Sequence, residues 1–222
     1  MSQRIGSRRL NLDFLKSLAS NWITRCKRAH KAILVNALFL GGAVLLCQGI
    51  YMDTKAIISQ ALIAHSWQQR TADRPPPKPW WWADTNAIAK LKVARLDKEL
   101  FIMRDDSGES LAFGPGHLAA SAAISSSGHV MIAGHRDTHF KFLKQLKLGD
   151  VIETTSVDSI TTRYQIKRMS ILDSSSEELI IYQQDRLTLI TCYPFDDFIP
   201  GGPLRYIVDA ERRTTKELNN SG

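Results

Sequence analysis

Cysteine is scarce in this chain of 222 residues, which contains three. Cys26 and Cys47 lie near the N-terminus, and only Cys192 follows residue 52. A small domain held by disulfides carries cysteines in pairs, so the part after residue 52 is not a disulfide scaffold. The chain also lacks internal repeats and low-complexity segments, which excludes a solenoid or a largely disordered protein.

Beyond residue 31 the chain has no excess of charge of either sign. The net charge is +7, but residues 1–31 hold eight Lys or Arg and one acid, Asp13, and the other 21 basic and 21 acidic residues cancel. A nucleic-acid-binding domain needs its positive charge on the folded body. The sequence therefore gives no support to nucleic-acid binding, and we expect residues 1–31 to be a basic cytoplasmic tail.

Residues 32–52 form a run of 21 residues that has no charged residue and only Asn36 and Gln48 as strongly polar members. About 20 apolar residues in a helix span a bilayer, and basic residues flank only the N-terminal side of this run. A cleaved signal peptide would end in a small-x-small pattern, and a lipoprotein site at Cys47 would not follow two bulky leucines. We expect an uncleaved, single-pass transmembrane helix with the N-terminus in the cytoplasm and the body outside it.

The next 27 residues connect this helix to the body. Apolar residues at helical spacing predict a helix over 53–69, which is either a stalk or a helix packed on the body. Arg74-Pro-Pro-Pro-Lys-Pro stops this helix and forms a stiff linker around 70–79, so 53–79 is interpreted as helical stalk and linker. Trp80 to Trp82 follow. They either contact the membrane interface or cover one end of the core.

Short β-prone stretches separated by Gly, Pro and Asp turns occupy the body, residues 80–211. Strands are expected to begin near Ile88 and to cover Leu100–Met103, Val130–Ala133, Val151–Thr155, Arg163–Ile171, Leu187–Thr191 and Leu204–Val208. One short helix is expected after Asp137. The pattern predicts a mainly β domain, either a barrel or a sandwich, with a polar tail at 212–222.

Cys192 ends the run Thr188-Leu-Ile-Thr-Cys, and Pro194 prevents the strand from continuing. A free cysteine is often a buried apolar residue. An unpaired thiol outside the cytoplasm is instead a chemical liability, which favours a reactive role.

A reactive thiol needs a base and a group that stabilises negative charge. His117, His129, His135 and His139 lie in the body, and His135 is preferred because it closes the apolar stretch Val130–Gly134. His139 and His117 remain alternatives, and Asp137 lies in a polar run beside His139. If the strands ending at Cys192 and beginning at Leu204 are antiparallel neighbours, Arg205 lies beside the thiol and can stabilise a thiolate or an oxyanion.

These residues resemble the motifs of the sortases, a family of membrane-anchored cysteine transpeptidases. Thr188-Leu-Ile-Thr-Cys192 is similar to the sortase cysteine signature, Gly134-His135-Arg136 to the histidine segment, and Arg205 to the sortase arginine on the next strand. Four further stretches resemble the Gram-negative group called class GN: Pro79–Thr85, Leu111–His117, His135–Phe140 and Thr191–Phe195.

The resemblance implies an eight-stranded closed β-barrel with one or two short helices, preceded by the transmembrane helix. It implies cleavage of a Leu-Pro-x-Thr-Gly-like (LPXTG-like) C-terminal sorting motif of an exported protein and transfer of the acyl group to an amine acceptor. Cys192 would be the nucleophile, His135 the acid and base, and Arg205 the oxyanion partner, with Thr191 assisting. No metal and no cofactor are implied, and the enzyme would sit in the inner membrane facing the periplasm.

Two other classes remain open from the sequence. A periplasmic L,D-transpeptidase is also a Cys/His enzyme on a β-scaffold, but its cysteine would stand in a Ser-x-Gly-Cys-type motif. A non-catalytic, membrane-tethered β-barrel binding module explains the helix and the barrel and leaves the thiol without a purpose.

Overall fold

The computed structural model describes residues 31, 33–48, 58–71, 74, 76–197 and 201–213. The chain divides into two compact units, Met1–Lys55 and Ala56–Gly222. In the first unit, residues 33–48 form a helix. No helix among the described residues is both long and apolar enough to cross a membrane.

Several sequence expectations reach beyond these ranges. The expected transmembrane helix includes residue 32 and residues 49–52, which lie outside the described residues, as do residues 1–30 of the basic tail. The same holds for residues 53–57 of the stalk and 214–222 of the polar tail. The transmembrane helix therefore stays a prediction.

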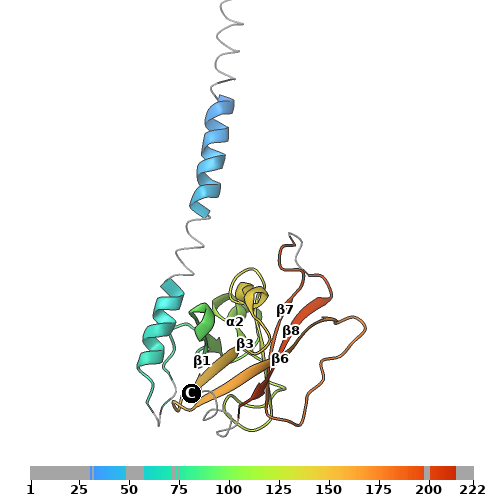
Figure 1. The fold of residues 1–222 in the computed structure, drawn as a ribbon. Coiled ribbons are helices and arrows are strands. Elements are labelled where there is room, and N and C mark those ends of the chain that lie inside the picture. Colours follow the sequence, from blue (N-terminus) through green and yellow to red (C-terminus); the bar gives the residue numbers. More distant parts are fainter. Residues whose placement is uncertain are drawn as a thin grey trace, which may run out of the picture. The chain divides into compact units, whose positions relative to one another are not determined.

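Eight strands close into a barrel in the second unit (Figure 1). They are β1 (Ala87–Val93), β2 (Lys98–Met103), β3 (Gly116–His117), β4 (His129–Ala133), β5 (Val151–Ser156), β6 (Thr161–Asp173), β7 (Arg186–Cys192) and β8 (Leu204–Arg212). Three short helical segments accompany them: η1 (Ala94–Leu96), α2 (Gly108–Phe113) and η2 (Lys141–Gln145). The expected mainly β barrel with short helices is confirmed, and the sandwich alternative was wrong.

The strand order around the barrel is β1-β2-β3-β4-β7-β8-β6-β5, and β5 pairs with β1 to close it. All seven predicted strands are present, and the predicted helix after Asp137 is η2. Neither β3, which is two residues long, nor the short helical segments α2 and η1 were predicted from the sequence. Ser107 begins α2 as its N-cap, because its side chain accepts a hydrogen bond from the Ser110 backbone N–H.

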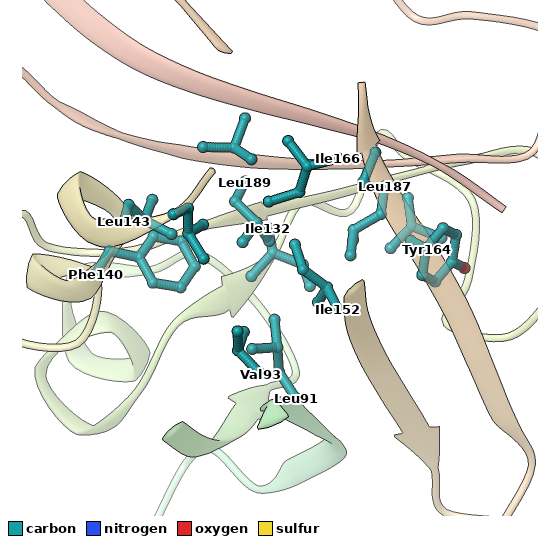
Figure 2. Packing of buried hydrophobic residues seen from close by; sticks show 14 of the residues in the cluster. Leu91, Val93, Ile132, Phe140, Leu143, Ile152, Tyr164, Ile166, Leu187 and Leu189 are labelled. Atoms are coloured by element: carbon teal, nitrogen blue, oxygen red, sulfur yellow. The ribbon is translucent and has the colours of Figure 1, made fainter. Parts of the chain in front are cut away.

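Alternating residues of each strand face opposite sides of the barrel wall. One set fills the interior, where the side chains from all around the barrel pack together (Figure 2). Its members on the three central strands are Val130 and Ile132 of β4, Leu187 and Leu189 of β7, and Val208 and Ala210 of β8. The other set faces outward, and there Met131, Ile190 and Ile207 form a separate small cluster.

The helix at residues 58–68 packs on the same unit as the barrel. Its Ile63 and Trp67 are buried against Ala87 and Met103, and the Gln60 side chain donates to the Phe113 carbonyl. This segment therefore extends the core.

The three tryptophans at residues 80–82 differ in their surroundings. Trp80 packs edge-on against Phe113 with ring centroids 4.9 Å apart, as a residue that covers the core would.

Trp81 and Trp82 are 86% and 60% exposed, so they do not cover the core. Their edge-on contact, with centroids 4.8 Å apart, is with each other. The core-cover interpretation is thus confirmed for Trp80, whereas membrane contact by Trp81 and Trp82 stays a prediction.

Replacement of Leu189 by Ala tests the interior packing. Leu189 is fully buried at the centre of the barrel, and its truncation leaves a cavity, so we expect a loss of about 2–5 kcal/mol in the free energy of unfolding. Urea denaturation measures this loss. Leu148→Ala is the matched control, because Leu148 is 64% exposed and its truncation changes the free energy by less than about 0.5 kcal/mol. Equal effects of the two variants would contradict the assignment of Leu189 to the core.

Candidate active site

Cys192 is the last residue of β7, a central strand between β4 and β8. Its side chain has the same parity as Thr188 and Ile190, so it belongs to the outer face, and it is partly exposed. The ladder continues one residue further, where the Tyr193 N–H donates to the Leu204 carbonyl at 3.0 Å. The thiol therefore has a rigid backbone mount and remains reachable from solvent.

Arg205 lies directly opposite Cys192 in the antiparallel pairing of β7 with β8. Directly opposed residues in an antiparallel pair project from the same face of the sheet. The Arg205 guanidinium donates to the carbonyls of Gly202 and Leu204, at 2.6 and 3.0 Å. The predicted neighbouring of the two strands is confirmed, and it brings a permanent positive charge to the strand end that carries the thiol.

The end of β4 lies on the other side of Cys192. β4 pairs with β7 in parallel, with Ala133 opposite Ile190, and the Gly134 N–H donates to the Ile190 carbonyl at 3.0 Å. The buried Thr191 hydroxyl donates to the Gly134 carbonyl at 2.7 Å. His135, which is exposed, follows directly. The register thus brings the backbone of His135 to the same end of the barrel as Cys192.

Gly134 is required by the packing behind His135. A Cβ atom at this position would lie 2.8 Å from the ring of Phe140, which is fully buried in the barrel core. The Phe140 N–H also donates to the His135 carbonyl at 2.9 Å. The turn that carries His135 is therefore closed on itself and anchored in the core.

Arg136 connects this turn to the loop that follows the cysteine. Its side chain is 8% exposed and donates from Nη2 to the Asp197 carbonyl at 2.9 Å. A second tie joins Lys144 to Asp196, with 3.2 Å between Nζ and Oδ1. Nothing in the sequence signals that Arg136 is buried.

The other two histidines considered as bases have different surroundings. His139 is half-buried; burial above all, and also the nearby His135, lower the pKa of its imidazole, while the Ala112 carbonyl and Asp137 oppose the shift. His117 lies on β3, and its Nε2 is 2.9 Å from the Ala122 carbonyl and 3.2 Å from the Ser121 hydroxyl. These contacts hold His117 within its own loop. Asp137, in the same run as His139, is exposed.

Aromatic rings adjoin the cysteine. Tyr193 stacks on Tyr206 with centroids 6.2 Å apart, and Phe195 meets Tyr206 edge-on at 5.1 Å. Burial, together with the neighbouring Tyr193, raises the pKa of the Tyr206 phenol. Tyr206 is opposite Thr191 in the ladder, so these rings border the residue that precedes the thiol.

No group of three or more His, Cys, Asp or Glu side chains suited to a metal ion occurs in the part of the chain that the structure describes. The polar side chains carried at this end of the barrel include those of His135, Arg136 and Arg205, with Asp137 next to Arg136 in the chain. The arrangement thus offers a partly exposed thiol on β7, a strand that lies between β4, which leads into the His135 turn, and β8, which carries Arg205.

Comparison with known proteins identifies the family. A profile described as the sortase domain matches residues 91–213, more than half of the chain. Sortase D of Bacillus subtilis (strain 168) is 32% identical over 127 residues, a match that covers 56% of this chain and 63% of that relative. The chain belongs to the sortase family, as the motifs predicted. The matched part spans less than two thirds of that curated relative.

Solved structures agree with this assignment. The catalytic domain of SrtD from B. anthracis is 34% identical, with a TM-score of 0.50 over 58% of this chain and 88% of that one. Sortase A from Corynebacterium diphtheriae has a TM-score of 0.53 over 73% of this chain and 84% of that chain, at 23% identity. At that identity the second likeness supports the fold alone.

The bond from Thr191 to Gly134 can be tested by replacing Thr191 with Val. Valine keeps the shape and leaves the buried Gly134 carbonyl without this donor, so we expect the free energy of unfolding to fall by about 1–3 kcal/mol. Thermal denaturation measures the change. Thr191→Ser is the matched control, because serine restores the hydroxyl, and it should recover part of the loss. Equal stability of the Val variant and the wild type would contradict a structural role for the bond.

Proposed function

We propose that the protein is a cysteine transpeptidase of the sortase type, with Cys192 as nucleophile, His135 as general acid and base, and Arg205 as oxyanion partner. The observation that carries the proposal is the register of three neighbouring strands. Cys192 is opposite Arg205 on β8, and the residue before His135 is bonded to β7. These pairings support the proposal, because they bring the backbones of Cys192, Arg205 and the His135 turn to one end of the barrel, where a nucleophile, a proton carrier and a cation are needed together.

In the first step, the proton of the Cys192 thiol passes to His135, and Cys192 Sγ attacks a backbone carbonyl carbon of the sorting motif. The carbonyl oxygen becomes an oxyanion, which the Arg205 guanidinium stabilises without any change in its own protonation. The C–N bond then breaks, His135 gives a proton to the departing amine, and a thioester to Cys192 remains. Arginine cannot act as the base at any relevant pH, so that role falls to the imidazole.

In the second step, an acceptor amine attacks the thioester carbon. The same His135, now neutral, takes the proton of the amine, and the Cys192 thiolate leaves as the new amide forms. Two thiol-mediated steps replace one direct amide exchange, which lowers each barrier, and one imidazole serves in both directions.

The substrate peptide is proposed to lie on the outer face of the barrel. A cavity of about 220 Å³ opens there, and its floor includes Met131, Thr188 and Ile207. Residues 177–180 and Tyr182 of the β6–β7 connection line its side, and we call residues 177–182 the wall segment. Its Ile180 is 65% exposed. The cavity has room for side chains rather than a whole ligand, as a peptide groove requires.

The remaining site candidates take supporting roles in this proposal. Thr191 fixes Gly134 and thereby the start of the His135 turn. His139, which is half-buried, and Asp137 near it in the chain support the turn that carries His135. His117 supports the loop after β3. None of these four residues carries the proton in the proposed reaction.

The proposed localisation rests on the N-terminal residues 1–52, and the proposed partners rest on the sortase motifs. We propose a class GN sortase held in the inner membrane by residues 32–52, with the N-terminus in the cytoplasm and the barrel in the periplasm. The described apolar side chains at residues 33–48 support this, because Leu34, Phe39 and Leu45 are 68%, 78% and 70% exposed. The partners are one exported protein with an LPXTG-like C-terminal signal and an amine-bearing acceptor, with no cofactor.

Family membership weighs against the two other classes. An L,D-transpeptidase would carry a different fold family, and the sortase profile here covers Cys192 and Arg205 as well as His135. A binding module without catalysis would not need a thiol between an imidazole and a guanidinium. Neither class has an observation of its own in its favour.

The nucleophile is tested by trapping. The full chain in detergent is incubated with a sorting-motif peptide, and mass spectrometry is expected to show an acyl adduct on Cys192 that Cys192→Ala abolishes. Cys47→Ala is the matched control and should retain the adduct. A well-folded wild-type chain that forms no adduct and cleaves no peptide would overturn the proposal.

The base is tested by replacing His135 with Ala. Loss of the proton carrier should lower the transfer rate by about 10²–10⁴-fold, because general acid and base catalysis typically contributes that much. Peptide cleavage followed by chromatography measures the rate, with His117→Ala as the control that keeps most of it. Retention of most activity by His135→Ala, together with its loss in His139→Ala or His117→Ala, would move the base.

A further inference from the structure

Buried polar residues lie on the outer face of the barrel, away from the thiol. Thr188 and Asp209 are each 2% exposed and have the same parity as Cys192 and Arg205 on their strands. Thr188 precedes Cys192 by four residues, about 13 Å along a strand. His129, at the start of β4, is also 2% exposed. The proposed reaction uses none of them, although all three line the cavity beside the wall segment.

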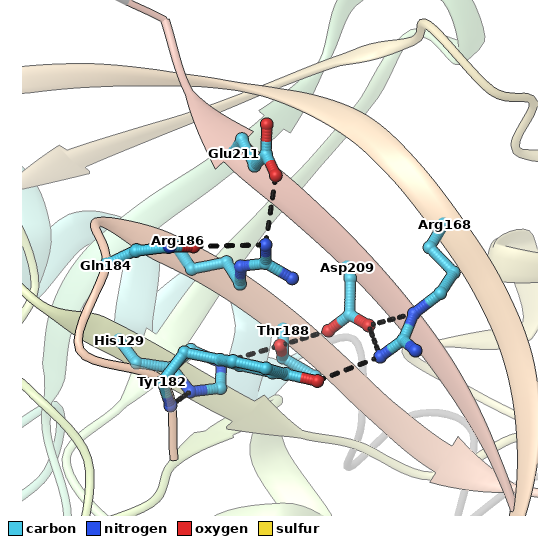
Figure 3. Close-up of polar contacts among 8 residues, drawn as sticks. All are labelled: His129, Arg168, Tyr182, Gln184, Arg186, Thr188, Asp209 and Glu211. Carbon is cyan, nitrogen blue, oxygen red and sulfur yellow. Dashed lines mark hydrogen bonds and ion pairs between the residues drawn. The ribbon is translucent and has the colours of Figure 1, made fainter. Parts of the chain in front are cut away.

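Five residues close a ring of hydrogen bonds here (Figure 3). His129 Nε2 lies 2.7 Å from Thr188 Oγ1, and the Thr188 hydroxyl donates to Asp209 Oδ1 at 2.6 Å. Arg168 donates from Nη2 to Asp209 Oδ2 at 2.7 Å and to the Tyr182 hydroxyl at 3.2 Å. The Tyr182 backbone N–H then donates to His129 Nδ1 at 3.2 Å. The ring crosses β4, β7, β8 and β6 and returns through Tyr182.

One protonation pattern satisfies every contact in the ring. The Thr188 hydrogen goes to Asp209, so the Thr188 oxygen accepts from His129 Nε2–H. Nδ1 of His129 accepts from the Tyr182 amide, so it carries no proton. His129 is therefore neutral in this ring, and a proton on Nδ1 would place two donors face to face.

Tyr182 is the residue through which the ring holds the wall segment, since it is the last residue of that segment. Its ring also contacts His129 at 5.4 Å between centroids, and the Arg186 guanidinium lies 4.4 Å from its ring centroid. Arg186 in turn donates to Glu211 Oε1 at 2.9 Å. Backbone, hydroxyl and ring of Tyr182 are each engaged by a different strand of the barrel.

We infer that Tyr182 is a positioning residue, locked by the ring of His129, Thr188, Asp209 and Arg168, and that it sets the wall segment against the cavity and so determines how tightly the substrate peptide binds. This inference rests on the proposed function for its substrate. The floor of the cavity is built on strands and is rigid, whereas its side is a connection of residues 174–185. The ring is what makes that side as well defined as the floor.

The ring makes the wall segment sensitive to acid. Burial lowers the pKa of His129, and the nearby Arg186 adds to this shift, while Asp209 opposes it. The other charged groups around the ring and cavity are Arg168, Glu177, Glu178 and Glu211. A histidine with a lowered pKa is neutral at neutral pH, so the ring is intact there and is lost as the pH falls through that pKa.

The ring is tested first by kinetics of Tyr182→Phe, which removes the hydroxyl that accepts from Arg168. In the full chain in detergent, KM for a sorting-motif peptide should rise about fivefold or more, with kcat changed by less than about twofold, because one hydrogen bond to a charged group is lost far from the thiol. Tyr164→Phe is the matched control: Tyr164 is buried in the core, and its KM should not change. A fall in kcat at constant KM, or no change in either, would overturn the inference.

Hydrogen exchange supplies a readout that needs no activity. Exchange at residues 176–182, corrected for the intrinsic effect of pH, should accelerate in the wild type between about pH 7.5 and pH 5 as His129 gains its proton. His129→Asn keeps an acceptor for the Tyr182 amide and cannot titrate there, so its exchange should stay flat. Equal acceleration in the variant would refute the role of His129. If neither the wild type nor any variant cleaves the peptide, the proposed function fails. The exchange result still shows whether the hydrogen-bond ring holds the wall segment.

Discussion

The parallel pairing of β4 with β7 is the interaction on which the rest of this structure depends. It sets Ala133 against Ile190 and lets the Gly134 amide and carbonyl bond to β7, so the turn that carries His135 begins beside the strand that ends in Cys192. The same two strands, at their other ends, carry His129 and Thr188. A slip of one residue would turn every side chain of β7 to the opposite face and remove both features at once.

The two faces of these central strands do different work. Inward residues such as Leu187, Leu189 and Val208 join the barrel core, and their burial keeps the strands in register. Outward residues do not fill the barrel interior. On this outer face, Cys192 and Arg205 lie at one end, and the buried hydrogen-bond ring lies at the other. Between the two ends lies the apolar patch of Met131, Ile190 and Ile207. A peptide lying on this face would have Cys192 and Arg205 at one end and the wall segment at the other.

Local patterns were enough to predict much of this arrangement. Alternation and turn residues located seven strands, and the antiparallel neighbouring of the strands around Cys192 and Arg205 followed from the short Gly/Pro loop between them. β3 was missed because two residues, Gly116 and His117, are too few for any periodicity. The burial of Arg136 and of His129 was invisible as well, since it arises from contacts with Asp197 and Thr188 about 60 residues away. The family motifs supplied the barrel, which residue patterns alone left open against a sandwich.

The separation along the chain of the strands that form the site has a consequence for folding. β7 and β8 are joined by a short loop, so Cys192 and Arg205 meet through a local hairpin, whereas the pairing of β4 with β7 must close a loop of more than fifty residues. Closing long loops carries more entropy loss and comes later than hairpin formation. We therefore expect Cys192 and Arg205 to pair before the His135 turn reaches them, and only the closed barrel holds all three residues at one end.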